Sequence, residues 1–128
     1  MRLLLDTHAL LWWLLDDPKL PPRCADWLRD RSNDVAISPV SAYELQFKAR
    51  KGLLHGIDGL IEELPAPADQ EGFTFLPLLW AHAVAAADFP LPHRDPFDRL
   101  LGAQAMTDGY ELLSIDAAFD GLGVPRVL

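Results

Sequence analysis

Four carboxylates stand at positions from which they could share one metal ion. Asp6 follows the apolar residues 3–5, and Asp116 follows residues 112–115. Each run is short and wholly or largely apolar, which is typical of a strand buried on both faces of a parallel sheet. Ligands bind such sheets at the carboxyl ends of the strands. If the two strands are neighbours, Asp6 and Asp116 face one crevice.

Glu44 and Asp98 interrupt the apolar faces of two expected helices. Each has apolar residues at helical spacing on its own face, namely Val40 and Phe47 for Glu44, and Leu101 and Ala105 for Asp98. A carboxylate on a core-facing helix side is costly unless a cation or a hydrogen-bond donor accompanies it. Four converging acids would repel one another and raise their own pKa values, and a divalent metal would remove that conflict.

Each acid also has a local interpretation that needs no metal. Asp6 and Asp116 could cap the helix or turn that follows them. The helical acids could form ion pairs or a capping box: Glu44 with Lys48 or Ser41, and Asp98 with Arg94. Taken singly, each position is explained as well by structure as by chemistry. Only the combination of the four indicates a metal site.

Expected strands alternate with expected helices, which predicts an α/β fold with a parallel sheet and helices on both faces. We expect strands over residues 3–5, 34–38, 73–76, 112–115 and 125–128. We expect helices over residues 8–15, 21–28, 39–51, 57–64, 80–87 and 96–107. The sequence contains no repeat and no linker, so residues 1–128 are expected to form a single domain.

The composition excludes several classes of protein. The chain has 128 residues, 50% of them hydrophobic, and its 11 basic and 19 acidic side chains give a net charge of −8. This charge argues against a broad basic surface for nucleic acid. It does not exclude a nucleic-acid enzyme whose carboxylates hold metal ions, because the metal supplies the local positive charge. One cysteine, Cys24, indicates a reducing cytoplasm, and no segment predicts a signal peptide or a membrane span.

Other polar and aromatic residues are weaker candidates. Thr7 or Ser114 could position a metal-bound water, and Asp95 could cap the helix from residue 96 or support Asp98. His8 and His93 could ligate a metal, although isolated histidines are more often surface groups.

The basic and aromatic residues have mainly structural interpretations. Arg94 and Arg99 are candidate phosphate contacts. The one tight basic cluster, Lys48, Arg50 and Lys51, is better explained as a solvated helix C-terminus. Trp12 and Trp13 are expected to anchor the core and an interface, and Cys24 to pack inside.

The segments around the four acids resemble the PIN-domain ribonucleases of the VapC toxin family. The similar segments are LLLDTHALLWW at residues 3–13, ISPVSAYEL at 37–45, HRDPFDRLL at 93–101 and LSID at 113–116. They occur in the family's order and span essentially the whole chain.

This resemblance implies a three-layer α/β/α sandwich with a central parallel sheet of four to five strands, and an acidic pocket for Mg²⁺ or Mn²⁺. It places the family's acids at Asp6, Glu44, Asp98 and Asp116. Many members carry the fourth aspartate three residues later, where this chain has Phe119. Asp120, one position further on, is therefore an alternative fourth acid.

The resemblance also implies an activity and partners. We expect a metal-dependent endoribonuclease that hydrolyses RNA, acts as a cytoplasmic toxin, pairs with a VapB-type antitoxin and forms a homodimer. The alternative is a non-catalytic α/β interaction module whose acids are caps and salt bridges. A phosphatase with an aspartyl nucleophile is disfavoured because His8 stands where a second Asp is needed. A receiver-type domain is disfavoured because residues 112–116 offer no lysine.

Overall fold

The computed structural model describes residues 1–90 and 95–128, and a parallel sheet of five strands lies at its centre. The strands are β1 (Arg2–Leu5), β2 (Asp34–Ile37), β3 (Thr74–Phe75), β4 (Glu111–Leu113) and β5 (Arg126–Val127). Their order across the sheet is β3-β2-β1-β4-β5. In this register Leu4 of β1 is paired with Ala36 on one side and Leu112 on the other. The strand that precedes Asp6 is therefore the central strand, with β4 beside it.

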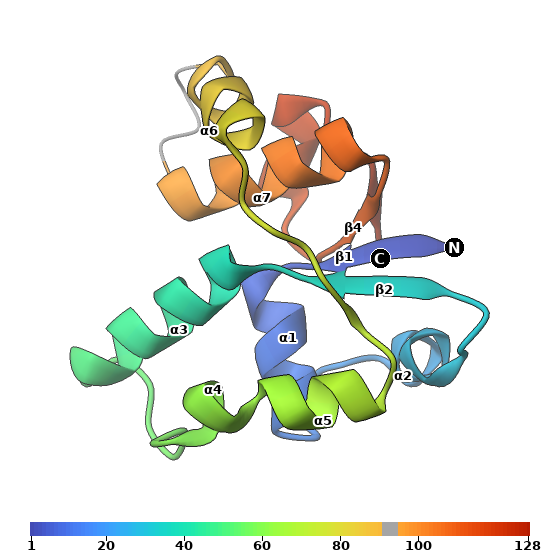
Figure 1. Cartoon of the computed structure of the whole chain (residues 1–128), viewed down its shortest axis with the longest axis vertical. Coiled ribbons are helices and arrows are strands. Elements are labelled where there is room, and N and C mark those ends of the chain that lie inside the picture. The colour runs from blue at the N-terminus through green and yellow to red at the C-terminus, as the bar shows by residue number, and fades with distance from the viewer. Residues whose placement is uncertain (91–94) are drawn as a thin grey trace.

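Helices cover both faces of the sheet, as Figure 1 shows. On one side lie α1 (Thr7–Leu14), α2 (Pro22–Arg29), α4 (Leu60–Glu63) and α5 (Pro65–Gln70). On the other side lie α6 (Trp80–Ala87), α7 (Pro96–Asp108) and the short 3₁₀ helix η1 (Ala117–Leu122). Helix α3 (Pro39–Arg50) leaves the carboxyl end of β2 and contacts both α1 and α7. The predicted three-layer α/β/α arrangement is confirmed.

Alternate side chains of the three central strands, β2, β1 and β4, supply two separate apolar cores. One core contains Leu5, Val35, Ile37 and Leu113; the other contains Leu4, Ala36 and Leu112. Successive side chains of a strand point to opposite faces, so a sheet covered on both faces needs apolar residues at every position. This is the physical reason why the strands read as unbroken apolar runs.

The expected helix over residues 57–64 is wrong in its extent. Helix α4 covers only Leu60–Glu63, and Pro65, the residue after the expected helix, begins α5. A proline fits the first turn of a helix because the N–H that it lacks would have no partner within the helix there. Pro67 also lies in the first turn of α5 and is tolerated for the same reason.

The fourth strand is shorter than expected. It ends at Leu113, and the backbone N–H of Asp116 donates to the Ser114 hydroxyl (3.0 Å) in the turn that follows. Asp116 therefore does not close the strand directly but lies beyond it, where it begins η1.

The apolar face expected on α3 is only half buried. Val40 and Glu44 are buried, but Phe47 is 44% exposed. The second half of α3 extends beyond the end of the sheet (Figure 1), and Lys51 places its ammonium over the Phe47 ring, 5.0 Å from the ring centre. Within the described residues, no helix is long and apolar enough to cross a membrane.

We expect Leu101→Ala to lower the free energy of unfolding by about 2–5 kcal/mol, the usual cost of truncating a buried leucine. Leu101 lies on α7 and is fully buried. Met106→Ala on the same helix is the matched control, because Met106 is 47% exposed and its loss should cost less than about 1 kcal/mol. Urea unfolding measures both. Equal losses in the two variants would contradict the assignment of this core.

Candidate active site

Asp6 is a buried carboxylate at the carboxyl end of the central strand. Its backbone N–H donates to the carbonyl of Leu113 (3.1 Å), and its Oδ1 accepts a hydrogen bond from the N–H of Ala9 (2.7 Å), which caps α1. Only 4% of the residue is exposed. Burial is the main reason why its pKa lies above the ordinary value, and the charge of Asp116 raises the pKa further. The nearby Ser114 side chain, the bond from Ala9 and the nearby His8 lower the pKa and offset this rise only in part.

Ser114 links Asp6 to Asp116. Its side chain lies near the Asp6 carboxylate and lowers the pKa of Asp6, and its oxygen accepts from the backbone N–H of Asp116 (3.0 Å). Asp116 is exposed and caps η1 by accepting from the N–H of Ala118 (2.9 Å). Both acids are therefore helix caps, as their local interpretation predicts, and they also lie within electrostatic reach of one another.

Asp120, the alternative fourth acid, is engaged elsewhere. Its two carboxylate oxygens accept from Nε and Nη2 of Arg126, at 2.9 and 3.0 Å. This guanidinium lowers the pKa of Asp120. Arg126 also donates from Nη1 to the carbonyl of Ser114 (3.0 Å), so it fastens the segment that carries Asp116. Sequence reasoning missed Arg126, because a lone arginine near the end of a chain carries no pattern.

Glu44 is buried on α3 and both of its oxygens have donors. The Thr7 hydroxyl donates to Oε1 (2.8 Å), and the ammonium of Lys48 contacts Oε2. Because the single hydroxyl hydrogen of Thr7 goes to Glu44, the bond between Thr7 and Ser41 (3.1 Å) is donated by Ser41. The predicted pair with Lys48 is confirmed. The capping box with Ser41 is wrong, since Ser38 caps α3 by accepting from the N–H of Val40.

Asp98 lies half-buried in the first turn of α7. Asp95 caps this helix: its Oδ1 accepts from the N–H groups of Phe97 (2.9 Å) and Asp98 (3.3 Å). The ring of Phe97 lies 5.8 Å from that of Tyr43, so the residues next to Asp98 and Glu44 are in contact. His93 and Arg94 lie outside the described residues, and with them the expected pair between Arg94 and Asp98.

Arg99, a candidate phosphate contact, is engaged within the protein. Its guanidinium donates to four backbone carbonyls at and beyond the end of α6, those of Ala86, Ala87, Phe89 and Pro90. The last carbonyls of a helix lack the usual partner one turn further along the chain, which makes the end of a helix a favourable place for an arginine.

Most of the other residues behave as expected. Cys24 is buried, Trp12 is nearly so, and the partly buried Trp13 packs on Phe73 with ring centres 4.9 Å apart. The two tryptophans therefore belong to the core. His8 is exposed beside Asp6.

The structure brings Asp6, Ser114 and Asp116 together, and Thr7 joins the helix that Asp6 caps to Glu44. Across residues 1–90 and 95–128, no three His, Cys, Asp or Glu side chains lie close enough to hold a metal ion between them. The chemistry of the donors nevertheless fits a hard divalent cation. Carboxylate oxygens are the ligands that Mg²⁺ and Mn²⁺ prefer, and a cation would relieve the repulsion between Asp6 and Asp116.

We expect Asp6→Asn to raise the free energy of unfolding at neutral pH in the absence of metal. The folded pKa of Asp6 is raised, so the folded chain loses stability as pH rises through that value, and Asn removes the charge while it still caps α1. The advantage of the variant should shrink as pH falls towards about 4. Urea unfolding across this range tests it. Asp58→Asn, at an exposed position, is the control and should show no such trend.

Comparison with known proteins places this chain in a family. The model of the PIN domain family matches residues 3–124. VapBC2 from Rickettsia felis, solved bound to a DNA fragment from their promoter, is similar with a TM-score of 0.72 and 14% identity, over 100% of this chain and 98% of that chain.

Two further solved structures are also similar. FitAcB from Neisseria gonorrhoeae has a TM-score of 0.62 and 18% identity, over 98% of this chain and 96% of that chain. FitAB bound to an IR36 DNA fragment has a TM-score of 0.62 and 19% identity, over 98% and 93%. Among curated proteins, no significant match is found. PIN domains are generally nucleases, and with nearly its whole length matched, this chain belongs to the PIN domain family.

Proposed function

We propose that this protein is a metal-dependent endoribonuclease and the toxin of a toxin–antitoxin pair. The observation that carries the proposal is the buried carboxylate of Asp6 at the end of the central strand, whose pKa is raised mainly by burial and further by the nearby anion of Asp116. Two anions so placed favour a cation between them. Asp6, Glu44, Asp98 and Asp116 would hold Mg²⁺ or Mn²⁺.

Neighbouring groups fix the positions of Asp6, Glu44 and Asp98 for metal binding. Ala9 and Ser114 hold Asp6, and the Thr7 hydroxyl orients Glu44. The cap at Asp95 sets the first turn of α7, from which Asp98 projects. A divalent ion bound there would lower the pKa of a bound water to as little as about 7 and neutralise charge that grows on the phosphate. The chain itself contributes position and negative charge, and no covalent enzyme intermediate is needed.

The test of the reaction is cleavage of a structured RNA with Mn²⁺ or Mg²⁺. We expect Asp6→Asn and Asp116→Asn to lower the rate by roughly 10–100-fold or more, because each removes a ligand charge and keeps the shape. Asp120→Asn is the matched control and should retain most of the activity, since Asp120 pairs with Arg126. A chelator should abolish cleavage.

Undiminished cutting by Asp6→Asn would overturn the assignment. Loss of cleavage with Asp120→Asn but not with Asp116→Asn would make Asp120, rather than Asp116, the fourth acid of the site. If the wild type neither cuts RNA nor binds Mn²⁺, the alternative of a non-catalytic interaction module is favoured.

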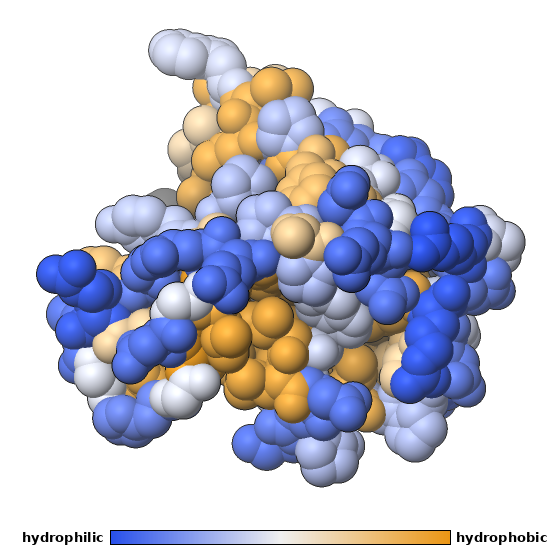
Figure 2. All heavy atoms as spheres, turned by 60° about the horizontal axis from the view of Figure 1, so that its bottom comes forward, coloured by the Kyte–Doolittle hydropathy of each residue, from blue (hydrophilic) through white to orange (hydrophobic). Residues whose placement is uncertain are grey.

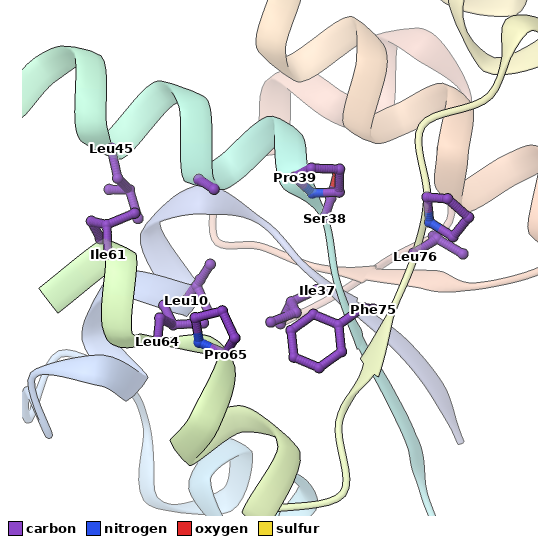
Figure 3. Close-up of a pocket in the computed structure, with 12 residues that line it drawn as sticks. Leu10, Ile37, Ser38, Pro39, Leu45, Ile61, Leu64, Pro65, Phe75 and Leu76 are labelled. Atoms are coloured by element: carbon purple, nitrogen blue, oxygen red, sulfur yellow. The ribbon is translucent and has the colours of Figure 1, made fainter.

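A pocket that is lined partly by α1 and α3, the helices that carry Thr7 and Glu44, supports an antitoxin partner. Its volume is about 400 Å³, and it lies between α1, α3 and the α4–α5 segment at the ends of β2 and β3 (Figure 3). Its lining is apolar apart from Ser38, and includes Leu10, Ile37, Leu45, Leu64 and Phe75. Figure 2 shows one face of the molecule on which hydrophobic side chains form a patch bordered by hydrophilic ones.

We propose that a VapB-type antitoxin places apolar side chains in this pocket and basic side chains near the acids. The charge of −8 is complementary to such a segment. The similar structures of VapBC2 and FitAB were each solved bound to a DNA fragment. We also propose a homodimer, on the resemblance to the VapC family.

Coexpression with a small DNA-binding protein encoded beside this gene tests the partner. Ala42 lines the pocket, and we expect Ala42→Asp to weaken the complex by at least about tenfold, because a charge in an apolar contact loses its water. Ala83→Asp on the exposed side of α6 is the control and should bind normally. Equal binding by both variants would contradict this docking site.

Light scattering on the chain alone measures whether it is a dimer.

A further inference from the structure

The carboxylate of Glu44 is already paired with a cationic side chain of the protein itself. The ammonium of Lys48 contacts Oε2, while the Thr7 hydroxyl donates to Oε1 (2.8 Å). The side chain of Glu44 is 6% exposed, whereas that of Lys48 is 35% exposed. Both oxygens of this buried carboxylate are therefore engaged by the protein's own donors before any metal arrives.

The position of Lys48 explains why it reaches Glu44. It follows Glu44 by one turn of α3, the spacing and order at which a lysine pairs best with a glutamate. It also lies in the last turn of the helix, where the dipole favours positive charge. A buried carboxylate without a partner is costly, and the Lys48 ammonium removes that cost.

The surroundings of Asp6 differ from those of Glu44. Its carboxylate accepts a hydrogen bond from a neutral donor, the N–H of Ala9, the neutral side chain of Ser114 lies nearby, and its pKa is raised by burial. Of these two acids, Asp6 would gain most from a divalent ion, whereas Glu44 would have to exchange one cation for another.

We propose that Lys48 is an internal counter-ion that a divalent metal must displace from Glu44, and that it thereby sets the metal affinity of the site. This inference rests on the proposed metal-dependent function. In the exchange, the hydrogen bond between the Lys48 ammonium and Oε2 breaks, Oε2 becomes available as a ligand, and the ammonium moves into the solvent that already reaches it. Thr7 keeps Oε1 in place throughout.

Calorimetric titration with Mn²⁺ tests the proposal. We expect Lys48→Gln to bind Mn²⁺ roughly two- to tenfold more tightly than the wild type, because one competing charge is gone and solvent screens the rest. Arg50→Gln is the matched control: it removes one positive charge from the exposed end of the same helix and should change the affinity less than about twofold. Lys48→Arg keeps the charge and should resemble the wild type. Equal or weaker binding by Lys48→Gln, compared with Arg50→Gln, would overturn the proposal.

A second measurement on the wild type does not depend on any variant. Brief acetylation with an N-hydroxysuccinimide ester, followed by mass spectrometry, reports how accessible each lysine amine is. Mn²⁺ should increase the labelling of Lys48 and leave that of Lys51, which lies over Phe47, unchanged. If Mn²⁺ binds without a change at Lys48, this inference fails and the nuclease proposal stands. If Mn²⁺ does not bind at all, both fail.

Discussion

The candidate site depends on the position of one ionisable side chain, Asp6. The central strand of a parallel sheet is covered on both faces, and its carboxyl end is the first point at which the chain can present a polar group. Asp6 takes that point, yet only 4% of it is exposed and its pKa is raised. The turn after β4 adds Asp116 at the same edge, so the fold concentrates negative charge where its strands end.

The local roles of the acids and a shared role are compatible. A carboxylate offers about four lone-pair positions, and a helix cap uses one of them. Asp6 and Asp116 each accept one backbone N–H through Oδ1, which leaves capacity for a further ligand. Glu44 is the exception, because Thr7 and Lys48 engage both of its oxygens. The acids therefore differ in how readily they can take a metal.

Patterns that follow from the sheet could be predicted from the sequence. Buried strands need unbroken apolar runs, so the parallel α/β fold and the place of Asp6 follow from residues 3–5 and their counterparts. Features that depend on tertiary contacts could not be predicted from the sequence. Arg99 turns to the carbonyls that end α6, Arg126 takes Asp120, and Phe47 is exposed because α3 extends past the sheet. The spacing of residues along the sequence does not predict these contacts.

The most direct test is a crystal of this protein soaked in Mn²⁺, with the ion located by its anomalous scattering. The account predicts a peak that contacts Asp6 and Asp116, with Glu44 or Asp98 completing the set. A peak elsewhere, or no peak while each acid keeps only its local partner, would contradict the claim that these carboxylates serve one metal.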